Sequence, residues 1–343
     1  MSSKTLREEL RQQTRAPLEP QLIYLAVKLS IPELLRDGPQ NSADLAQQLA
    51  VHAPSLHRAL HGMAILDLVR EEGEQRFSLT ARGALLQRDH PESLADDALI
   101  TGELLPAWGG LLRSVQTGEP AFDTIFGQGL FSYAADHPEL EQSFNRHMAG
   151  MTATIAQAVT QAYDFSAVAR IVDVGGGYGT LLLRILAAYP AIRGVLFDLP
   201  AVIASARNYL AASSVGARAD CVPGDFFHIV PAGADLYILQ VVIHDWDDAA
   251  ALRILTTCAR AMRDDSRILL IERLLPERAV DAPAVIQGDL NMLVLTGGRE
   301  RTAQEYDQLL TAAGLERTQI VATQSQWSVI EAKRRLPLHD CVS

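Results

Sequence analysis

Hydrophobic and polar residues follow the period of α-helices through the first part of the chain. Apolar side chains recur about every four residues before the turn at 37–39, at Leu22, Ile23, Ala26, Val27 and Ile31. A second helix is predicted from about residue 55 to 68, with apolar positions at Leu56, Leu60, Met63, Ala64 and Leu68. Between them, residues 43–50 form a short predicted helix for which Ser42 is the expected N-cap.

Residues 70–80, REEGEQRFSLT, contain two short strand-like runs about Gly73, and a further helical segment follows them. Two helices followed by a two-stranded wing are the pattern of a winged helix. Such a module binds DNA in some proteins and in others serves as a packing unit for dimerisation or as a lid. The second helix offers only Arg58, His57 and His61, and the net charge of −11 disfavours a phosphate backbone. Packing is therefore the favoured interpretation.

From residue 167 the pattern changes to apolar strand-like runs that alternate with helices. The runs are RIVDV at 170–174, GVLFDL at 194–199, DLYILQVVI at 235–243 and RILLIER at 267–273. Strands that alternate with helices predict an α/β domain with a Rossmann-like, doubly wound parallel sheet. We therefore divide the chain into a mostly helical, winged-helix-like domain (1–100), a helical connector (101–164) and an α/β domain (165–343).

The composition limits the classes of partner. The chain has 343 residues, 48% hydrophobic and 21% charged, which suits a soluble globular protein with two cores. Cys221, Cys258 and Cys341 lack the spacing of a metal site or a disulfide framework, so we expect a reduced, cytoplasmic protein without a metal. The polar N-terminus lacks the apolar core of a signal peptide, and no run of roughly 20 apolar residues predicts a membrane span. Neither nucleic acid nor membrane is an expected partner.

The stretch RIVDVGGGYGT at 170–180 predicts a nucleotide-type cofactor site, because a buried strand runs there into a glycine-rich turn and a helix. Gly175 and Gly177 allow a ligand to approach the backbone closely. Dinucleotide-binding proteins use a similar turn, but the spacing here is G-x-G-x-G, not G-x-G-x-x-G. Asp173 suits the ammonium group of a methionine moiety, whereas it would repel a pyrophosphate. A structural cap on the turn is the alternative role for Asp173.

Further cofactor candidates follow the next two strands. Asp198 can accept hydrogen bonds from ribose hydroxyls, a feature that NAD and S-adenosyl-methionine share, and Leu199 is placed to pack on an adenine. Asp225 can accept from an adenine amino group while Phe226 covers the ring, unless this segment is an ordinary loop.

His244 follows the run DLYILQVVI at 235–243, in HDWDD, beyond the end of a strand, where open parallel sheets place their chemistry. An imidazole is the natural base near neutral pH. A phenol has a pKa near 10 and His a pKa near 6.5, so unaided deprotonation costs on the order of 5 kcal/mol. A carboxylate beside the imidazole lowers that cost, and Glu272 and Glu300 are the candidates. Taken singly, His244 has an alternative role as a structural histidine, and Glu272 and Glu300 have one as surface acids. The catalytic interpretation therefore depends on the occurrence of all three.

These segments together resemble the plant-type and bacterial small-molecule O-methyltransferases, the group that includes caffeic acid O-methyltransferase and many antibiotic-pathway enzymes. The resemblance covers essentially the whole chain and is specific because the segments occur in order. They are AVKLSIPELLRDGP at 26–39, FSLTARG at 77–83, VDVGGGYG at 172–179, FDLP at 197–200, GDFF at 224–227, HDWDD at 244–248 and GGRERT at 297–302.

The resemblance implies a Rossmann-like class I methyltransferase domain and an N-terminal dimerisation domain, in a homodimer whose subunits help to close each other's substrate pockets. The implied cofactor is S-adenosyl-methionine, at Gly175, Asp198, Leu199, Asp225 and Phe226. The implied base is His244, with Glu272 and Glu300 as its supporting acids. The implied pocket residues are Phe144, Met148, Met151, Asp289, Asn291 and Met292.

Two departures from the plant enzymes bear on the substrate. Gln240 stands where many plant members carry Lys, and it can bind the cofactor without adding charge. Met151 stands where a phenylpropanoid enzyme has His. We therefore expect methyl transfer to a hydroxyl of a small aromatic natural product, phenolic or polyketide-like. Two alternatives stay open: a family member that binds the cofactor but catalyses hydroxylation, decarboxylation or rearrangement, and a non-enzymatic transcription regulator.

Overall fold

The computed structural model describes residues 3–335, which form two compact units. One comprises the chain up to Gly109 together with Phe131–His147, and the other comprises Gly110–Leu130 and the chain from Met148 onward. Helix α11 (Pro138–Ala162) contributes residues to both. The predicted boundaries at residues 100 and 164 remain a proposal about domains.

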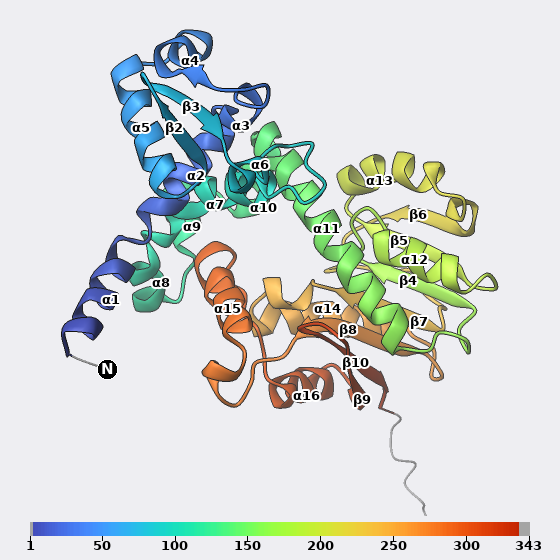
Figure 1. The fold of residues 1–343 in the computed structure, drawn as a ribbon. Coiled ribbons are helices and arrows are strands. Elements are labelled where there is room, and N and C mark those ends of the chain that lie inside the picture. The colour runs from blue at the N-terminus through green and yellow to red at the C-terminus, as the bar shows by residue number, and fades with distance from the viewer. Residues whose placement is uncertain (1–2, 336–343) are drawn as a thin grey trace, which may run out of the picture. The chain divides into compact units, whose positions relative to one another are not determined.

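The N-terminal unit is mostly helical, as predicted, and packs about one apolar core. A three-stranded sheet of order β1-β3-β2 accompanies the helices (Figure 1). The predicted wing corresponds to β2 and β3, and the pattern did not predict β1. The elements are α1 (Ser3–Arg15), α2 (Leu18–Lys28), α3 (Ile31–Leu34), β1 (Gln40–Asn41), α4 (Ser42–Leu49), α5 (Ala53–Ile65), β2 (Val69–Gly73), β3 (Arg76–Leu79), α6 (Ala81–Ala84), α7 (Ala95–Trp108) and α10 (Leu130–Asp136).

The N-cap of α4 corrects one prediction. Asn41, not Ser42, caps the helix, because its extended backbone lets its side chain accept the Ala43 N–H at 2.9 Å. Ser42 is the first helical residue, and its hydroxyl lies 3.0 Å from Nδ1 of His57. The prediction of Ser42 was wrong by one position, because both residue types are good caps and stand side by side.

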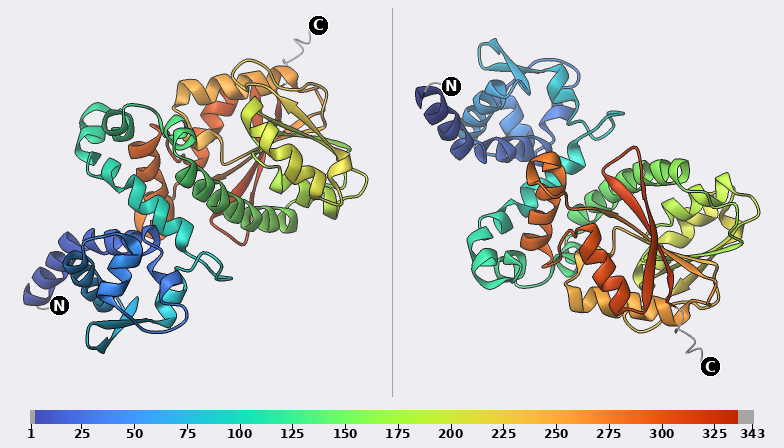
Figure 2. Two further views of the ribbon diagram at one scale, coloured as in Figure 1. Left: turned by 90° about the horizontal axis from the view of Figure 1, so that it is seen from above. Right: turned by 90° about the horizontal axis from the view of Figure 1, so that it is seen from below.

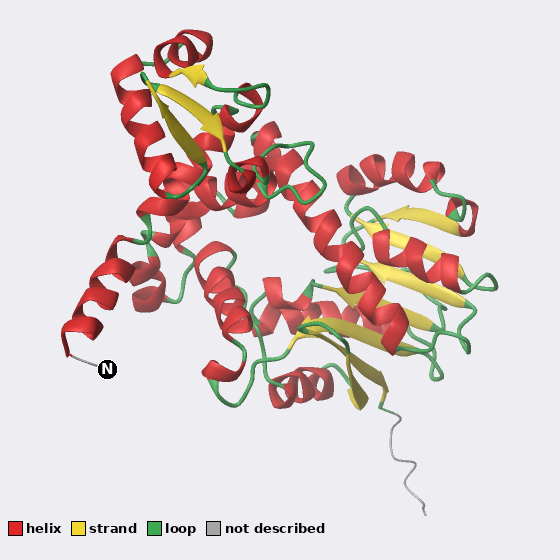
Figure 3. Cartoon of the chain, in the orientation of Figure 1, coloured by secondary structure: helices red, strands yellow, loops and turns green. Residues whose placement is uncertain are grey.

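The larger unit is built on a seven-stranded sheet of order β6-β5-β4-β7-β8-β10-β9 (Figure 3). Its strands are β4 (Arg170–Val174), β5 (Arg193–Asp198), β6 (Ala219–Pro223), β7 (Leu236–Gln240), β8 (Arg267–Arg273), β9 (Leu315–Ala322) and β10 (Trp327–Arg334). The parallel sheet is confirmed for the first five strands in this order. Strand β10 runs antiparallel to both β8 and β9, which the sequence pattern did not predict.

Helices cover both faces of this sheet (Figure 2), because alternate strand residues point to opposite sides. Leu239 packs with residues of α14 and α16, whereas the adjacent Ile238 packs with residues of α11, α12 and α13. The helical elements are α8 (Leu111–Thr117), α9 (Ala121–Phe126), α12 (Thr180–Ala188), α13 (Pro200–Ala212), η1 (Gly216–Arg218), η2 (Ile243–Asp245), α14 (Asp248–Ala261), η3 (Ala279–Asp281), α15 (Pro283–Leu295) and α16 (Ala303–Ala312).

The strand order fixes where a ligand site can form. Strand β4 lies between β5 and β7, because the chain adds β5 and β6 on one side of β4 and then crosses to add β7 and β8 on the other. A crevice is expected at such a switch point, beyond the carboxyl ends of the strands. The glycine turn follows β4, and the His244 segment follows β7.

Candidate active site

Asp173 presents an unsatisfied carboxylate at the switch point. The residue is 1% exposed, and neither of its carboxylate oxygens has a hydrogen-bond partner within residues 3–335. Burial and, to a smaller extent, the charge of Asp198 raise the pKa of Asp173 to about 7, although the Leu182 backbone N–H acts in the opposite direction. Buried polar groups normally have partners, so this carboxylate is suited to a cationic ligand group.

The glycine turn wraps closely around this carboxylate. A Cβ on Gly176 would lie 2.5 Å from the carboxyl carbon of Asp173, a contact that sequence analysis missed. Gly175 and Gly177 adopt positive φ angles of 69° and 58°. A Cβ on Gly175 would approach Val242 Cγ2 to 3.1 Å. Glycine is therefore required at 175 and 176 by the close approach of neighbouring atoms, and at 175 and 177 by the positive φ angle.

Asp198 is tied to the same turn. Its Oδ2 accepts the Gly177 N–H at 2.9 Å and its Oδ1 accepts the Leu199 N–H at 2.7 Å. Burial raises the pKa of Asp198. Each oxygen keeps a further lone pair, so the residue can still accept from ribose hydroxyls. Leu199 is 52% exposed and thus free to cover a ligand ring.

Asp225 and Phe226 lie next to this group. Phe226 Cε1 would be 3.5 Å from a Cβ on Gly175, which places the ring beside the glycine turn. Asp225 Oδ1 accepts the Phe227 N–H at 2.8 Å, so it caps its own loop. That bond is compatible with both the cofactor role and the loop alternative for Asp225.

Gln240 ends β7 with a second unsatisfied acceptor. Its Nε2 donates to Thr152 Oγ1 at 3.3 Å, while its buried Oε1 has no hydrogen-bond partner among the described residues. The residue therefore offers a neutral acceptor at the switch point.

The turn after β7 is strained and is held by Glu272. Val241 has a φ of 57°, which is unfavourable for a β-branched residue. The N–H groups of Val242 and Ile243 both donate to Glu272 Oε1, at 3.1 and 2.8 Å. Strand β8 thus supplies the carboxylate that fixes the backbone leading to His244, a role that sequence analysis did not foresee.

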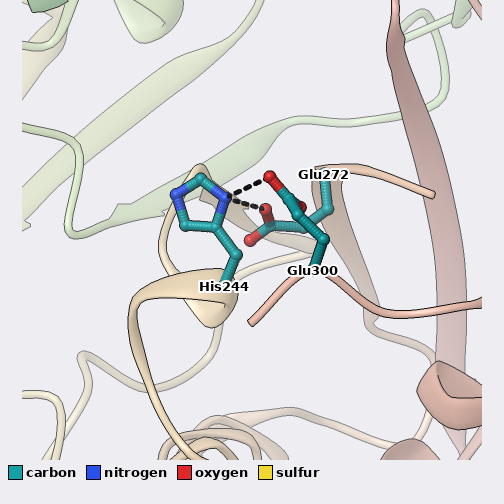
Figure 4. A group of neighbouring side chains, drawn as sticks. All are labelled: His244, Glu272 and Glu300. Carbon is teal, nitrogen blue, oxygen red and sulfur yellow. Dashed lines mark hydrogen bonds and ion pairs between the residues drawn. The ribbon is translucent and has the colours of Figure 1, made fainter. Parts of the chain in front are cut away.

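His244, Glu272 and Glu300 converge in a buried cluster (Figure 4). His244 is 5% exposed, and its Nδ1 lies 3.3 Å from Glu300 Oε1 and 3.5 Å from Glu272 Oε2. Figure 4 shows Nδ1 facing both carboxylates, with Nε2 pointing away from them. In the neutral imidazole, two acceptors at Nδ1 favour the tautomer that carries its proton there, so that Nε2 has the lone pair.

The charges around this imidazole change its titration. Burial lowers the pKa of His244, but the charges of Glu272, Asp245 and Glu300 outweigh it and raise that pKa to about 9. Asp245 Oδ1 lies 3.6 Å from Nε2 and was missed as a site residue. Burial and the charge of Glu300 raise the pKa of Glu272 to about 7, against the opposing effect of His244.

Glu300 is positioned by two residues besides His244. Its backbone N–H donates to Asp289 Oδ1 at 2.9 Å, so Asp289 supports the acid-bearing segment. Burial raises the pKa of Asp289. The Arg273 guanidinium lies 3.5 Å from Glu300 Oε1 and stacks 4.3 Å from the centre of the Trp327 ring. Sequence analysis missed Arg273, because its approach depends on the pairing of Trp327 with Arg273 across β10 and β8.

The other pocket candidates lie on two helices. Met148 and Met151 are half-buried on α11, and Asn291 and Met292 are half-buried on α15. Phe144, also half-buried on α11, belongs to the N-terminal unit. Their contribution to a substrate pocket stays a prediction.

The donor atoms of His244, Glu272 and Glu300 lie within 4.8 Å of one another, which is close enough to hold a metal ion. The expectation that the site works without a metal stays a prediction. Cys221 and Cys258 are free thiols, and burial raises the pKa of Cys258 to about 12. Cys341 lies outside the described residues.

Comparison with known proteins identifies the family. Residues 108–316 match the model of the O-methyltransferase domain, and residues 14–89 match that of the O-methyltransferase dimerisation domain. The chain belongs to the O-methyltransferase family. The fold class expected from the resemblance is confirmed: an N-terminal dimerisation domain followed by a methyltransferase domain.

Relatives of this O-methyltransferase act on aromatic molecules. The chain is 42% identical to phenazine O-methyltransferase PhzM of Lysobacter antibioticus, over 91% of this chain and 92% of the relative. It is 36% identical to 8-amino-8-demethylriboflavin N,N-dimethyltransferase of Streptomyces davaonensis, over 91% of each. Among solved structures, the O-methyltransferase NcsB1 from neocarzinostatin biosynthesis, in complex with S-adenosyl-methionine and 2-hydroxy-5-methyl naphthoic acid, matches with a TM-score of 0.84. This match is at 30% identity and covers 92% of this chain and 95% of that one.

The expected activity class is therefore confirmed: this chain is an S-adenosyl-methionine-dependent O-methyltransferase. Within residues 3–335, no helix combines the length and apolar character needed to cross a membrane.

Proposed function

We propose that this enzyme methylates a hydroxyl of a small aromatic natural product, with His244 as the general base. The observation that carries the proposal is the buried His244–Glu272–Glu300 cluster at the same sheet edge as the unsatisfied Asp173 carboxylate. The named substrates of relatives, phenazine and naphthoic acid ring systems, support an aromatic acceptor.

The residues around the glycine turn fit S-adenosyl-methionine. Asp173 and the Gln240 Oε1 supply buried, unpartnered acceptors for the ammonium end of the methionine moiety. Asp198 would bind the ribose hydroxyls, while Leu199, Asp225 and Phe226 would hold the adenine. When bound, the cofactor supplies a methyl group activated by a sulfonium centre.

His244 removes the acceptor's proton in this proposal. Its Nε2 would accept the hydroxyl proton as that hydroxyl oxygen is methylated. The imidazolium that results is stabilised by Glu272 and Glu300 at Nδ1, which also fix the orientation of the ring. Positioning and exclusion of water by the buried surroundings supply the remaining acceleration.

The surrounding acids make His244 a stronger base by raising its pKa. An ordinary His has a pKa about 3.5 below that of a phenol, a gap of roughly 5 kcal/mol. With the pKa of His244 raised to about 9, its pKa lies much closer to that of a phenol and the cost of proton transfer falls. The acids thus increase the basicity of His244 in addition to orienting it.

Several finer features belong to this proposal. The dimerisation domain supports a homodimer, and the N-terminal unit would act as a winged-helix-like packing module without binding nucleic acid. We place the enzyme in the cytoplasm, in secondary metabolism that leads to antibiotic-like products. Met148, Met151, Asp289, Asn291 and Met292 would line the acceptor pocket, and Phe144 stays a prediction from the resemblance.

The test is a screen of phenazines, naphthoates and simple phenols with isotopically labelled S-adenosyl-methionine. A product that gains one methyl group on oxygen supports the proposal. Methylation on nitrogen would reassign the acceptor atom, as in the riboflavin-type relative. A product without the label would favour the non-methylating alternative.

The role of His244 is tested by His244→Ala. We expect kcat to fall by about 100-fold or more, with the Kd for the cofactor unchanged, because the polar partners of His244 are Glu272, Glu300 and Asp245 and not the proposed cofactor residues. An unchanged kcat would remove His244 as the base.

A further inference from the structure

Arg301 has a completely buried guanidinium whose donors are directed at the segment that carries His244. Its side chain is 0% exposed, which is costly for a cation unless the surroundings satisfy it. The partner acid, Asp248, is 59% exposed at the start of α14. The charge pair alone therefore does not explain why this guanidinium is buried.

The backbone contacts provide that explanation. Arg301 Nη1 donates to the Ile243 carbonyl at 3.1 Å, and Nη2 donates to the Trp246 carbonyl at 2.8 Å. Nε and Nη2 both donate to Asp248 Oδ1, at 2.9 and 2.7 Å. One guanidinium thus fastens both sides of the short helix η2, which carries His244.

The backbone beside Arg301 holds the same segment. The Arg299 N–H donates to the His244 carbonyl at 2.8 Å. A Cβ on Gly298 would lie 2.1 Å from that carbonyl oxygen, so this contact requires glycine. On its other side, the Arg301 carbonyl accepts the Leu275 N–H at 2.9 Å, in the connection that follows β8 and Glu272. Residues 298–301 therefore join the segments that bear all three members of the cluster.

We propose that Arg301 is a positioning residue for methyl transfer, which sets the distance between His244 and Glu300 by fastening both to one rigid unit. Glu300 is the chain neighbour of Arg301, and its carboxylate reaches Nδ1 of the imidazole that Arg301 holds from the backbone side. Arg301 acts through His244 and does not touch the reacting atoms. This inference rests on the proposed function.

The test is Arg301→Lys, which keeps the positive charge but replaces a planar fork by a single nitrogen. One ammonium group cannot bridge the Ile243 and Trp246 carbonyls in the same geometry. We expect kcat to fall by about 10- to 100-fold, because small misplacements of a catalytic group have effects of that size. The KM for S-adenosyl-methionine should change by less than about 2-fold, because the glycine turn is untouched.

A second readout does not depend on activity. In the cofactor-free protein, an NMR titration of His244, assigned by the signal lost in His244→Ala, reports its contact with Glu272, Glu300 and Asp245. If Arg301→Lys moves the acids away from the imidazole, the apparent pKa of His244 falls by about 1. This measurement keeps its meaning even if His244 proves not to be the base, which separates failure of this inference from failure of the proposed function.

Arg317→Lys is the matched control. Arg317 makes a two-pronged bond to Asp307 away from the cluster, with Nη2 2.7 Å from Oδ2, and its replacement should leave kcat and the His244 titration unchanged. If Arg301→Lys does not fold, Asp248→Asn carries the test, since its side chain is largely exposed. Asp248→Asn should lower kcat by about 3-fold and should also lower the apparent pKa of His244. Wild-type kcat and an unshifted His244 titration in the folded variant would overturn the inference.

Discussion

The carboxyl side of the sheet holds buried carboxylates in contrasting states at two places, one at Asp173 and the other beside His244. At the end of β4, neither oxygen of Asp173 has a hydrogen-bond partner within the described chain. Near the ends of β7 and β8, Oε1 of Glu272 accepts two backbone N–H groups and Oε1 of Glu300 contacts both His244 and Arg273, while Oε2 of each glutamate has no hydrogen-bond partner among the described residues. The Asp173 carboxylate therefore has no preformed hydrogen bond, whereas each glutamate is already held through one of its oxygens.

This contrast separates the residues that bind the cofactor from those that position the base. A buried acceptor that the protein leaves unsatisfied is stabilised when a ligand supplies the donor. A base held by preformed contacts does not need to reorganise during the reaction. Substitutions at Asp173 should therefore change cofactor affinity, and substitutions around His244 should change turnover.

The largest expected effect after loss of the base itself is that of Glu272→Gln. The amide oxygen can still accept from Val242 and Ile243, so the turn is kept, but an NH₂ group then faces Nδ1 and disfavours the productive tautomer. We expect kcat to fall by about 100-fold or more with little change in cofactor affinity, measured by steady-state kinetics and calorimetry.

Glu331→Gln is the control for that variant. Glu331 is another buried glutamate, on β10, and binds Tyr163, Thr318 and Gln319 away from the cluster. Its replacement should leave kcat within about 2-fold of wild type. Equal losses in the two variants would mean that buried charge supports only the fold.

A smaller effect is expected for Asp173→Asn, in β4 beside the glycine turn. Loss of the ion pair with the ammonium group should weaken cofactor binding by about 30-fold, since a hydrogen bond to a charged group contributes about 1.5–3 kcal/mol. Calorimetry measures the change. The control is Asp235→Asn, whose Oδ2 accepts the Ala169 and Arg170 N–H groups at the start of β4, and which should bind normally.

The cofactor-free stability of the same variant should move in the opposite direction. The pKa of Asp173 is raised to about 7 in the folded protein, so its contribution to stability is present below its ordinary pKa near 3.8 and is lost as pH rises through 7. At pH 8, Asp173→Asn should therefore raise the Tm of the cofactor-free enzyme. A lower Tm together with weaker binding would contradict the idea of an unsatisfied carboxylate.

Much of the fold was predictable, because local pattern determines much of it. Apolar strand-like runs that alternate with helices indicated the parallel strands, and the helical period indicated the N-terminal unit. Strands β9 and β10 were missed, since LERTQIVA and WSVIEAKR mix polar and apolar residues at the end of the sheet. Pairing with β8 decides their structure, and such long-range pairing is not visible in a local pattern.

The site was predictable in its residue types more than in its supports. His244 follows β7, Glu272 lies near the end of β8 and Glu300 lies in the loop before α16, and the structure brings them together. Asp245, Arg273 and Arg301 were missed, because each acts through a contact that only the folded chain creates. An arginine in the sequence gives no sign that its side chain will be fully buried.

The most direct test of the central claim is the pH dependence of kcat/KM for the acceptor, measured with two acceptors of different pKa. If His244 is the base, the rate rises as its proton is lost, with an apparent pKa of about 9 that is the same for both acceptors. In Glu272→Gln this rise should move to lower pH, because one of the charges that raises the pKa of His244 is gone. A rise that follows the acceptor's pKa and ignores Glu272→Gln would contradict the account.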